Sequence, residues 1–400
     1  MIKELNLNNW KSFSDAKLYI DPMTFIIGTN ASGKSNILDA LSFLHFISMG
    51  MPIETVLKEH IRGGAEWAVR KGCNSFSLTI IDEQIGYDYE YQVVCGFSEN
   101  NVFELESERL ERRGKRKLPA KTIFVTDKDS DYIASTIPVR FYTAKRGKQK
   151  RLDLTKKISV LSQVEVLPVI KPVKDICSLI IEDLRRIFVL NPIPNHMRNY
   201  CGLSDKLNED AGNIAGVIAG LPSEAQEEIE SKISEYVRPL PERDINKVWA
   251  ETVGRFKNDA MLYCEECWND GQCEVMDARS MSDGTLRFIA IVTALLTEKS
   301  GSLIVIEEID NGLHPSRASE LIRVLEKLGS KRNIDILCTT HNPVLIDALG
   351  IEMLPVISFV SRAKEDGTSV IEPVEDCHNI MKLMANYTIG ELMTKDKLSK

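Results

Sequence analysis

The pattern of apolar and polar positions predicts strands, a loop and a helix within the first 45 residues. Residues 25–27 are a continuous apolar run, which is typical of the buried end of a strand. Ile37, Leu41 and Leu44 then recur at helical spacing. A polar, glycine-containing loop separates the two, so the chain is expected to pass from a strand through a loop into a helix.

Further along, the pattern changes twice. Residues 73–143 contain short runs in which apolar and polar residues alternate, and these predict an antiparallel β section. Residues 155–260 predict a helical insertion, without the sustained heptads of a long coiled-coil arm. The run 303–306 and the apolar run before His341 read as buried strands. The elements predict an α/β protein in three parts, residues 1–155, 156–260 and 261–400.

Length and composition fit a globular protein with a core. The chain has 400 residues, 43% of them hydrophobic, so two or three domains are expected. The sequence shows no signal-peptide pattern and no apolar run long enough to span a membrane, which predicts a cytoplasmic protein with no membrane association. The net charge of −8 argues against a surface that attracts nucleic acid as a whole. Nine cysteines are expected to be reduced thiols.

The clearest motif is a phosphate-binding loop. Gly28, Gly33, Lys34 and Ser35 fit the pattern G-x-x-x-x-G-K-[ST] between a predicted strand and a predicted helix, which is the context that the motif requires. The glycines let backbone N–H groups surround the phosphates, the lysine contacts the β and γ oxygens, and the serine hydroxyl binds Mg²⁺. The chain is therefore expected to bind a nucleotide and Mg²⁺.

Two carboxylates follow a buried strand downstream. Glu307 and Glu308 stand at the C-terminal end of the run 303–306, where open α/β sheets place their ligands. Glu307 would complete the Mg²⁺ site, and Glu308 would polarise the attacking water. His341 ends the next apolar strand and is placed to contact the γ-phosphate.

A second anion-binding helix start is predicted at residues 282–284. Ser282 is expected to cap a strongly apolar helix, so that free N–H groups at its start, near Gly284, can bind an anion. One site does not need two such helices. The second helix is therefore expected to face the nucleotide of another subunit.

The order of these motifs resembles the ABC-type ATPase heads of the RecF, SMC and OLD families over most of the chain. The resemblance is carried by the loop at 28–35, "SDG", "IVIEE", "NGLHP" and "TTH", and it is greatest to the OLD-like ATPases that are common in bacterial defence systems. It implies an ABC-type P-loop head with an antiparallel β section and a helical lid insertion. Residues 1–155 would be the N-terminal lobe, 156–260 the lid, and 261–400 the C-terminal lobe with the signature, the acidic strand and the switch histidine.

The same resemblance implies a role for each residue in hydrolysis of ATP to ADP and phosphate. Glu308 would be the catalytic base, His341 the switch histidine, and His314 part of the D-loop region. Glu307 stands where many ABC ATPases have Asp, and it would bind Mg²⁺ with Ser35 and the Q-loop residue Gln163. Lys34 would act in catalysis as well as binding. The implied nucleotide contacts are Lys11, Gly28, Asn30, Gly33, Lys34, Ser35, Asn36, Gln163, Ser282 and Gly284.

Two functions are compatible with this resemblance. One is an ATP-driven switch of an anti-phage defence complex, a homodimer or higher homo-oligomer that controls a separate effector such as a nuclease. The sequence after His341 supports it, because it offers no acidic cluster for two-metal cleavage. The alternative is a RecF-like DNA-binding ATPase of repair or recombination. A GTPase is disfavoured because the run that starts at Asn246 lacks the Asp of the base-reading motif, and a transporter subunit because of the helical insertion.

Two local clusters leave alternatives open. The basic runs at 112–117 and 145–151 are either solvated hairpin turns or contacts to DNA phosphates. Cys264, Cys267 and Cys273 contain a Cys-x-x-Cys zinc half-site, but no fourth ligand is nearby. Cys264 and Cys267 would also point to opposite faces of a regular strand.

Overall fold

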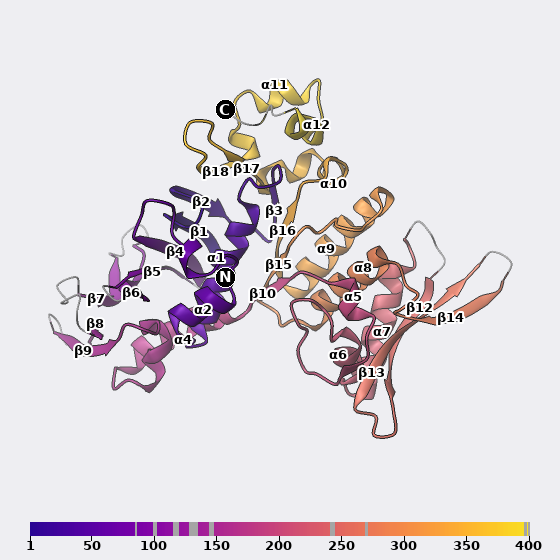
Figure 1. The fold of residues 1–400 in the computed structure, drawn as a ribbon, viewed down its shortest axis with the longest axis horizontal. Coiled ribbons are helices and arrows are strands. Elements are labelled where there is room, and N and C mark those ends of the chain that lie inside the picture. Colours follow the sequence, from indigo (N-terminus) through magenta and orange to yellow (C-terminus); the bar gives the residue numbers. More distant parts are fainter. Residues whose placement is uncertain are drawn as a thin grey trace. The chain divides into compact units, whose positions relative to one another are not determined.

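The computed structural model describes residues 1–84, 86–98, 102–114, 120–127, 135–143, 148–240, 245–268, 271–395 and 398. The chain forms two compact units, and each is described by itself (Figure 1). The first unit contains Met1–Asp21, Gly28–Ile187 and Ser358–Pro373, and the second contains Pro22–Ile27, Phe188–Ile357 and Val374–Lys400. Neither unit is a continuous stretch of sequence. The predicted three-part division of the chain stays a prediction.

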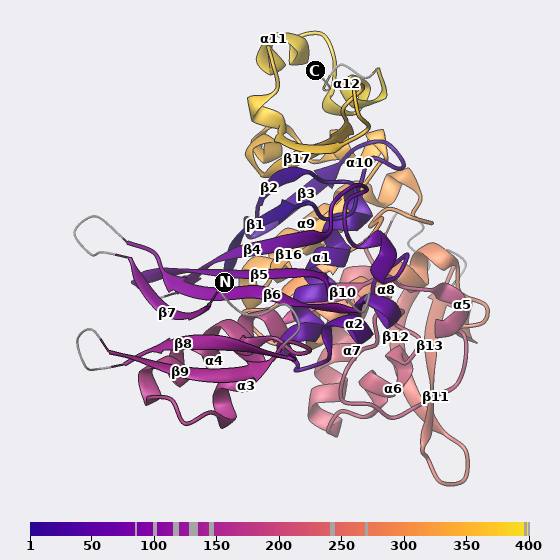
Figure 2. The same ribbon diagram turned by 60° about the vertical axis from the view of Figure 1, so that its left-hand side comes forward.

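The first unit is built on an eight-stranded antiparallel sheet in the order β2-β1-β4-β5-β6-β7-β8-β9 (Figure 2). Buried residues alternate with half-buried ones along β4 and β5, as in a sheet that packs one face on a core. The predicted antiparallel section is confirmed. Its strands are β1 (Ile2–Asn8), β2 (Asp15–Tyr19), β4 (Ser75–Gln84), β5 (Tyr87–Phe97), β6 (Phe103–Arg112), β7 (Lys121–Thr126), β8 (Thr136–Tyr142) and β9 (Gln149–Thr155).

Helix α1 (Lys34–Ser48) packs into the core of the first unit against α2, α3 and α4. The fully buried ring of Trp10 lies 4.8 Å from that of Phe76 and 5.8 Å from that of Phe43, measured between centroids. These aromatic contacts tie α1 to the sheet. The other elements of this unit are α2 (Ile53–Glu59), η1 (Ala65–Trp67), α3 (Val160–Gln163), η2 (Val164–Val166), α4 (Lys171–Arg185), and the hairpin of β17 (Ile357–Arg362) and β18 (Ser369–Pro373).

Parallel strands form the centre of the second unit. β15 (Leu303–Ile306) pairs with β16 (Asp335–Thr340), which pairs with β3 (Met23–Ile27), and β10 (Ile187–Leu190) lies beside β15. Every residue of β15 and β16 is buried, as expected of parallel strands covered on both faces. The strands expected at 303–306 and before His341 are confirmed. Helices α8 (Asp283–Thr297) and α9 (Ala318–Arg332) pack against each other, and α9 contacts β16 and β3.

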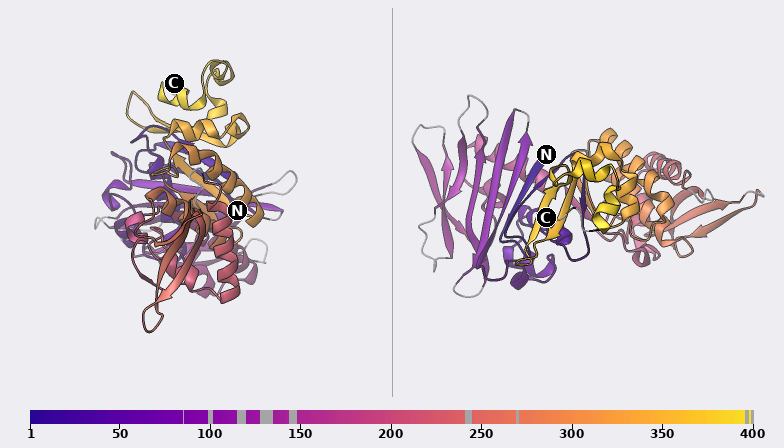
Figure 3. Two further views of the ribbon diagram at one scale, coloured as in Figure 1. Left: turned by 90° about the vertical axis from the view of Figure 1, so that its right-hand side faces the viewer. Right: turned by 90° about the horizontal axis from the view of Figure 1, so that it is seen from above.

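The second unit also contains a four-stranded antiparallel sheet. β13 (Asp259–Cys267) pairs with β12 (Ile245–Val253) on one side and with β11 (Cys201–Gly202) and β14 (Cys273–Asp277) on the other. Helices α6 (Ile214–Ala219) and α7 (Ser223–Val237) contact this sheet (Figure 1), and its strands extend past the helices (Figure 3). The segment 156–260, expected to be helical, therefore also contains β10, β11, β12 and the start of β13. β12 is held by pairing with β13, most of which lies after residue 260.

Short elements complete the second unit. They are α5 (Pro194–Met197), η3 (Pro315–Arg317), α10 (Pro343–Ala348), η4 (Ile351–Val356), η5 (Val374–Asp376), α11 (Ile380–Met384) and α12 (Ile389–Thr394). Asp347 joins two of them, because its carboxylate accepts hydrogen bonds from Thr388 and from the Gly390 N–H. Among the described residues, none of the helices has both the length and the apolar character needed to cross a membrane.

A fully buried carboxylate lies at the middle of the first unit. Glu108, on β6, accepts hydrogen bonds from Tyr91 Oη (3.0 Å), Ser159 Oγ (2.8 Å) and the backbone N–H groups of Val160 (2.6 Å) and Leu161 (2.8 Å). The last three donors belong to the turn that begins α3, so Glu108 holds that turn on the sheet. Burial raises the pKa of Glu108 to about 7, although the donated hydrogen bonds lower it.

The raised pKa of Glu108 predicts a pH-dependent stability. The folded chain keeps this proton to higher pH than the unfolded chain, so the free energy of unfolding should fall as the pH rises from about 4.5 to 7, by up to about 3 kcal/mol. Glu108→Gln removes the titrating group. Urea unfolding of both chains across this range should show wild type losing its stability relative to Glu108→Gln as the pH rises. Glu274→Gln, at an exposed position on β14, should follow wild type, and parallel curves for all three chains would contradict the prediction.

Candidate nucleotide site

The phosphate loop joins the end of β3 to the start of α1. Gly28 has φ +152°, and a Cβ there would lie 2.2 Å from the backbone oxygen of Val360. Gly33 has φ +117°, and a Cβ there would lie 2.6 Å from Ser369 Oγ. Both positions therefore require glycine for packing as well as for backbone freedom. The spacing of the glycines predicted a phosphate loop. In the structure, a larger residue at either position would distort the backbone of that loop.

Lys34 is the first residue of α1, and its side chain bends back over the loop. Its Nζ donates hydrogen bonds to the backbone oxygens of Gly28 (2.7 Å) and Thr29 (2.9 Å). Gly33 contributes no side-chain cap to α1, so the first N–H groups of a 15-residue helix face the loop. A buried ammonium and a helix start thus meet where the motif expects phosphate.

The other predicted residues near the loop differ in their surroundings. Asn30 is exposed on the loop. Ser35 is half-buried and its backbone oxygen accepts a hydrogen bond from Arg62 at 2.8 Å. Asn36 Nδ2 donates to Ser12 Oγ at 2.8 Å, so in this structure its amide fastens the helix start to the preceding segment.

Lys11 is held by an ion pair on α1. Its Nζ contacts the carboxylate of Asp39 and donates to the backbone oxygen of Arg62 at 2.7 Å. Arg62 Nη2 lies 2.9 Å from the same carboxylate. Burial lowers the pKa of Lys11, while the Asp39 carboxylate opposes the shift. The role of Lys11 as a nucleotide contact stays a prediction, because the structure gives its charge a protein partner.

Gln163 is the last residue of the four-residue helix α3. Its Nε2 donates to the backbone oxygens of Ile158 (3.1 Å) and Ser159 (3.2 Å). The amide nitrogen is therefore hydrogen-bonded within the turn that Glu108 anchors. The Mg²⁺ and nucleotide roles expected of Gln163 stay predictions.

In the second unit, Glu307 and Glu308 follow β15 directly. Glu308 has φ +45°, a conformation that is uncommon for a residue with a side chain. Its N–H donates to Thr339 Oγ1 at 2.9 Å, which holds the backbone in place. Its carboxylate is exposed, and Oε1 lies 3.8 Å from His341 Nδ1. The two residues that the sequence assigned to hydrolysis are therefore neighbours.

The turn after Glu308 contains a residue that the sequence analysis missed. Asp310 Oδ1 accepts a hydrogen bond from Thr340 Oγ1 at 2.5 Å, which ties the turn to the end of β16. The sequence signal that could have identified Asp310 is its position two residues after Glu308 in the run "EEIDNGLHP". His314 lies further along, where its Nδ1 caps η3 and lies 2.7 Å from Ser316 Oγ.

Ser282 is the N-cap of α8, as predicted, and its Oγ accepts from the Thr285 N–H at 3.1 Å. A Cβ on Gly284 would lie 2.5 Å from the backbone oxygen of Gly312, so the helix start packs closely on the turn after Glu308. Arg317 was also missed by the sequence analysis. It is buried, and its guanidinium reaches Thr285 Oγ1 at 3.3 Å. The signature and the acidic turn of one chain are thus packed together.

The basic runs fall partly outside the described residues. Of the first run, Arg112 lies over the ring of Tyr87 and Arg113 donates to Glu90 at 3.1 Å. Of the second, Lys150 donates to the backbone oxygen of Pro168. These side chains have protein contacts, and their proposed contact with DNA stays a prediction.

The cysteines correct one expectation. Cys267 and Cys273 form a disulfide, so not all nine cysteines are free thiols. The two lie directly opposite each other on β13 and β14, an arrangement that depends on strand register and not on sequence spacing. Cys264 is buried on the other face of β13, as the predicted alternation requires.

Two protein families match parts of the chain. The family described as "AAA ATPase domain" matches residues 1–171. The family described as "AAA domain, putative AbiEii toxin, Type IV TA system" matches residues 270–347. The first match includes the phosphate loop, and the second includes the signature, the acidic strand and His341. No curated protein matches the sequence.

Solved SMC head domains match most of the chain. An SMC head bound to the C-winged helix domain of ScpA matches with a TM-score of 0.55 and 15% identity, over 93% of this chain and 97% of that one. The SMC head domain from Thermotoga maritima matches with a TM-score of 0.47 and 14% identity, over 93% and 98%. At such identities the first match shows the fold alone. The first match confirms the predicted α/β fold of an ABC-type head, and the two family matches support the predicted class of P-loop ATPase.

Proposed function

We propose that this chain hydrolyses ATP with Mg²⁺ and works as a nucleotide-driven switch. The observation that carries the proposal is the geometry of Glu308. Its backbone is held in a left-handed conformation by Thr339, and its exposed carboxylate lies beside His341 at the carboxyl ends of parallel strands. Unfavourable backbone conformations that the surroundings enforce are concentrated at functional sites. This carboxylate is therefore our candidate for the general base that activates water.

The phosphate loop would supply the binding energy. Lys34 donates to two carbonyl groups of its own loop, and on nucleotide binding its ammonium would exchange them for β and γ phosphate oxygens. The uncapped N–H groups at the start of α1 would bind the same phosphates. Ser35 and Glu307, with Gln163, offer the oxygen ligands that Mg²⁺ prefers. The ion would neutralise charge on the phosphates.

The proposal predicts that Glu308→Gln uncouples binding from turnover. The amide keeps the size of the side chain but cannot accept the proton of water, so ATP should bind with near-normal affinity while kcat falls by about 10²–10⁴-fold. The measurement is phosphate release at saturating ATP, alongside equilibrium binding of a fluorescent ATP analogue. Glu326→Gln, on the exposed face of α9, should behave as wild type. Full turnover by Glu308→Gln would remove Glu308 from the role assigned to it.

We further propose that ATP closes a symmetric pair of chains. The phosphate loop and the capped start of α8 are two separate anion-binding helix starts, and one nucleotide site needs only one of them within its own chain. In a two-fold pair, the loop of one chain would meet Ser282 and Gly284 of the other. Each nucleotide would then be held by two chains.

Mixed variants test this pairing. Lys34→Ala disables the loop and Ser282→Arg disables the signature, so each variant alone should lack ATPase activity. In a mixed pair, the intact loop of the Ser282→Arg chain meets the intact signature of the Lys34→Ala chain, which gives one working site of two. Random pairing of equal amounts makes about half of the pairs mixed, so about a quarter of the wild-type activity should return. Phosphate release is measured for each variant and for the mixture, after circular dichroism has shown that both are folded. A mixture no more active than its components would contradict shared sites.

The output of the switch is proposed to be a separate effector, such as a nuclease of a defence system. Within the described residues, the one close group of three His, Cys, Asp or Glu side chains that could hold a metal ion is Glu265, Cys267 and Cys273, which is not the acidic set of a two-metal nuclease. A solved SMC head was captured with a ScpA domain, which supports protein partners for this fold. To transmit a signal, the partner must bind the ATP-closed and open states with different affinities. The alternative is a RecF-like ATPase whose ligand is duplex DNA, and the fold is compatible with either function.

DNA experiments separate the two functions. If the chain is a switch for a protein effector, it should leave plasmid DNA intact with Mg²⁺ or Mn²⁺, and ATP-loaded Glu308→Gln should bind duplex no better than the nucleotide-free chain. If it is RecF-like, duplex affinity should rise with ATP and fall steeply with salt, because counterions are released from the phosphates. Fluorescence anisotropy with a labelled duplex at several salt concentrations measures both. Plasmid cleavage that Glu308→Gln abolishes would contradict the need for a separate nuclease.

A further inference from the structure

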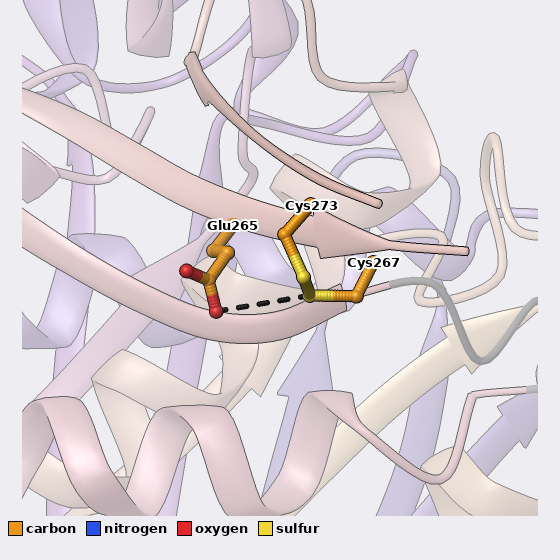
Figure 4. A group of neighbouring side chains, drawn as sticks. All are labelled: Glu265, Cys267 and Cys273. Carbon is orange, nitrogen blue, oxygen red and sulfur yellow. Dashed lines mark hydrogen bonds between the residues drawn. A yellow bond between two sulfur atoms is a disulfide. The ribbon is translucent and has the colours of Figure 1, made fainter. Parts of the chain in front are cut away.

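Three side chains converge at the end of the hairpin formed by β13 and β14 (Figure 4). The register places Cys273 directly opposite Cys267, and Glu265 precedes Cys267 by two residues, so it points to the same face. Glu265 Oε2 lies 3.9 Å from Cys267 Sγ. All three ligand atoms lie within 4.8 Å of one another. In the structure the two sulfur atoms are joined as a disulfide.

The carboxylate of this group is held in place from the neighbouring strand. Asn246, on β12, donates a hydrogen bond to Glu265 Oε2 at 2.6 Å. Such support by a second residue is characteristic of carboxylates that bind metals, because it fixes the orientation of the ligand oxygen. Cys264 lies on the buried face of β13 and cannot join the group. Cys264 and Cys267, which form the Cys-x-x-Cys motif, therefore do not bind one ion together. The second thiol of the group is that of Cys273, on the opposite strand.

We propose that the reduced hairpin binds one Zn²⁺ ion through the thiolates of Cys267 and Cys273 and the carboxylate of Glu265. Once reduction separates the two sulfurs, two thiolates and one carboxylate oxygen make a borderline-soft ligand set suited to tetrahedral zinc, with water in the fourth position. Cys273 is exposed and the other two residues are half-buried, so an ion can reach the site from solvent. The proposal is independent of ATP hydrolysis.

Oxidation would remove this site. A low-molecular-weight disulfide RSSR would oxidise the two cysteines by taking two electrons from their sulfur atoms. The Cys267–Cys273 bond forms as the S–S bond of RSSR breaks, and the two thiol protons leave on two RSH molecules. In the zinc-bound form those protons come from solvent and the ion is released, because disulfide sulfurs carry no thiolate charge. The hairpin would thus alternate between a covalent and a metal cross-link at one position.

Zinc and cobalt binding to the full chain test the proposal. The chain is reduced, freed of reductant without air, and titrated with Zn²⁺ by calorimetry and with Co²⁺ by absorbance, where thiolate ligation gives a charge-transfer band. One ion per reduced chain is expected, and none per oxidised chain. Cys267→Ser and Cys273→Ser should lose the site and the band. Glu265→Gln should keep the band and bind at least about tenfold more weakly.

Two matched variants control for nonspecific effects. Glu266→Gln changes the neighbouring acid, which faces the other side of β13, and Cys73→Ser removes a half-buried thiol in the first unit. Both should bind zinc as wild type does. The oxidised wild-type chain is a control that needs no substitution, so misfolding of a variant cannot decide the result. Absence of stoichiometric zinc in the reduced chain, or equal uptake by the oxidised chain or by Cys273→Ser, would overturn the proposal.

Discussion

Parallel pairing of β3 with β16 orders the edge of the second unit at which Glu307, Glu308 and His341 follow their strands. The register pairs Ile27 with Thr340, residues from opposite ends of the chain. The chain therefore leaves these two neighbouring strands at the same edge of the sheet, after Ile27 and after Thr340. β15 pairs with β16 on its other side and leads into Glu307 at that edge. Because these strands are buried on both faces, the apolar core fixes the register, and the register places the polar residues that follow.

Backbone conformations that residues normally avoid occur where the chain leaves these strands. Gly28 and Gly33 have positive φ values in the loop after β3, and Ala31 between them has φ +61°. Glu308 has φ +45° after β15. Glycine tolerates this conformation, but Ala31 and Glu308 carry side chains, so the surrounding structure must hold them there, as the hydrogen bond from the Glu308 N–H to Thr339 Oγ1 illustrates. The surrounding structure thus stabilises unfavourable backbone conformations at Ala31 and Glu308, which we attribute to nucleotide binding and catalysis.

Buried ionisable groups of the first unit are held by hydrogen bonds and ion pairs. Glu108 accepts four hydrogen bonds, Lys11 pairs with Asp39, and the Lys34 ammonium is held by backbone oxygens. Phosphate oxygens bind an ammonium more strongly than carbonyl groups do, so a bound nucleotide would replace the carbonyl oxygens of Gly28 and Thr29 around Lys34.

Local sequence alone determined the phosphate loop, the buried strands around it, the antiparallel section and the cap at Ser282, because each depends on spacing between residues close in the chain. Tertiary structure decided what depends on distant partners. It inserted strands into 156–260 by pairing β12 with β13, gave Lys11 its partner Asp39, and brought Thr339 to the backbone of Glu308. It also joined Cys267 to Cys273 beside Glu265 and left Cys264 buried. Sequence spacing cannot reveal such contacts, since strand register and packing between remote segments determine them.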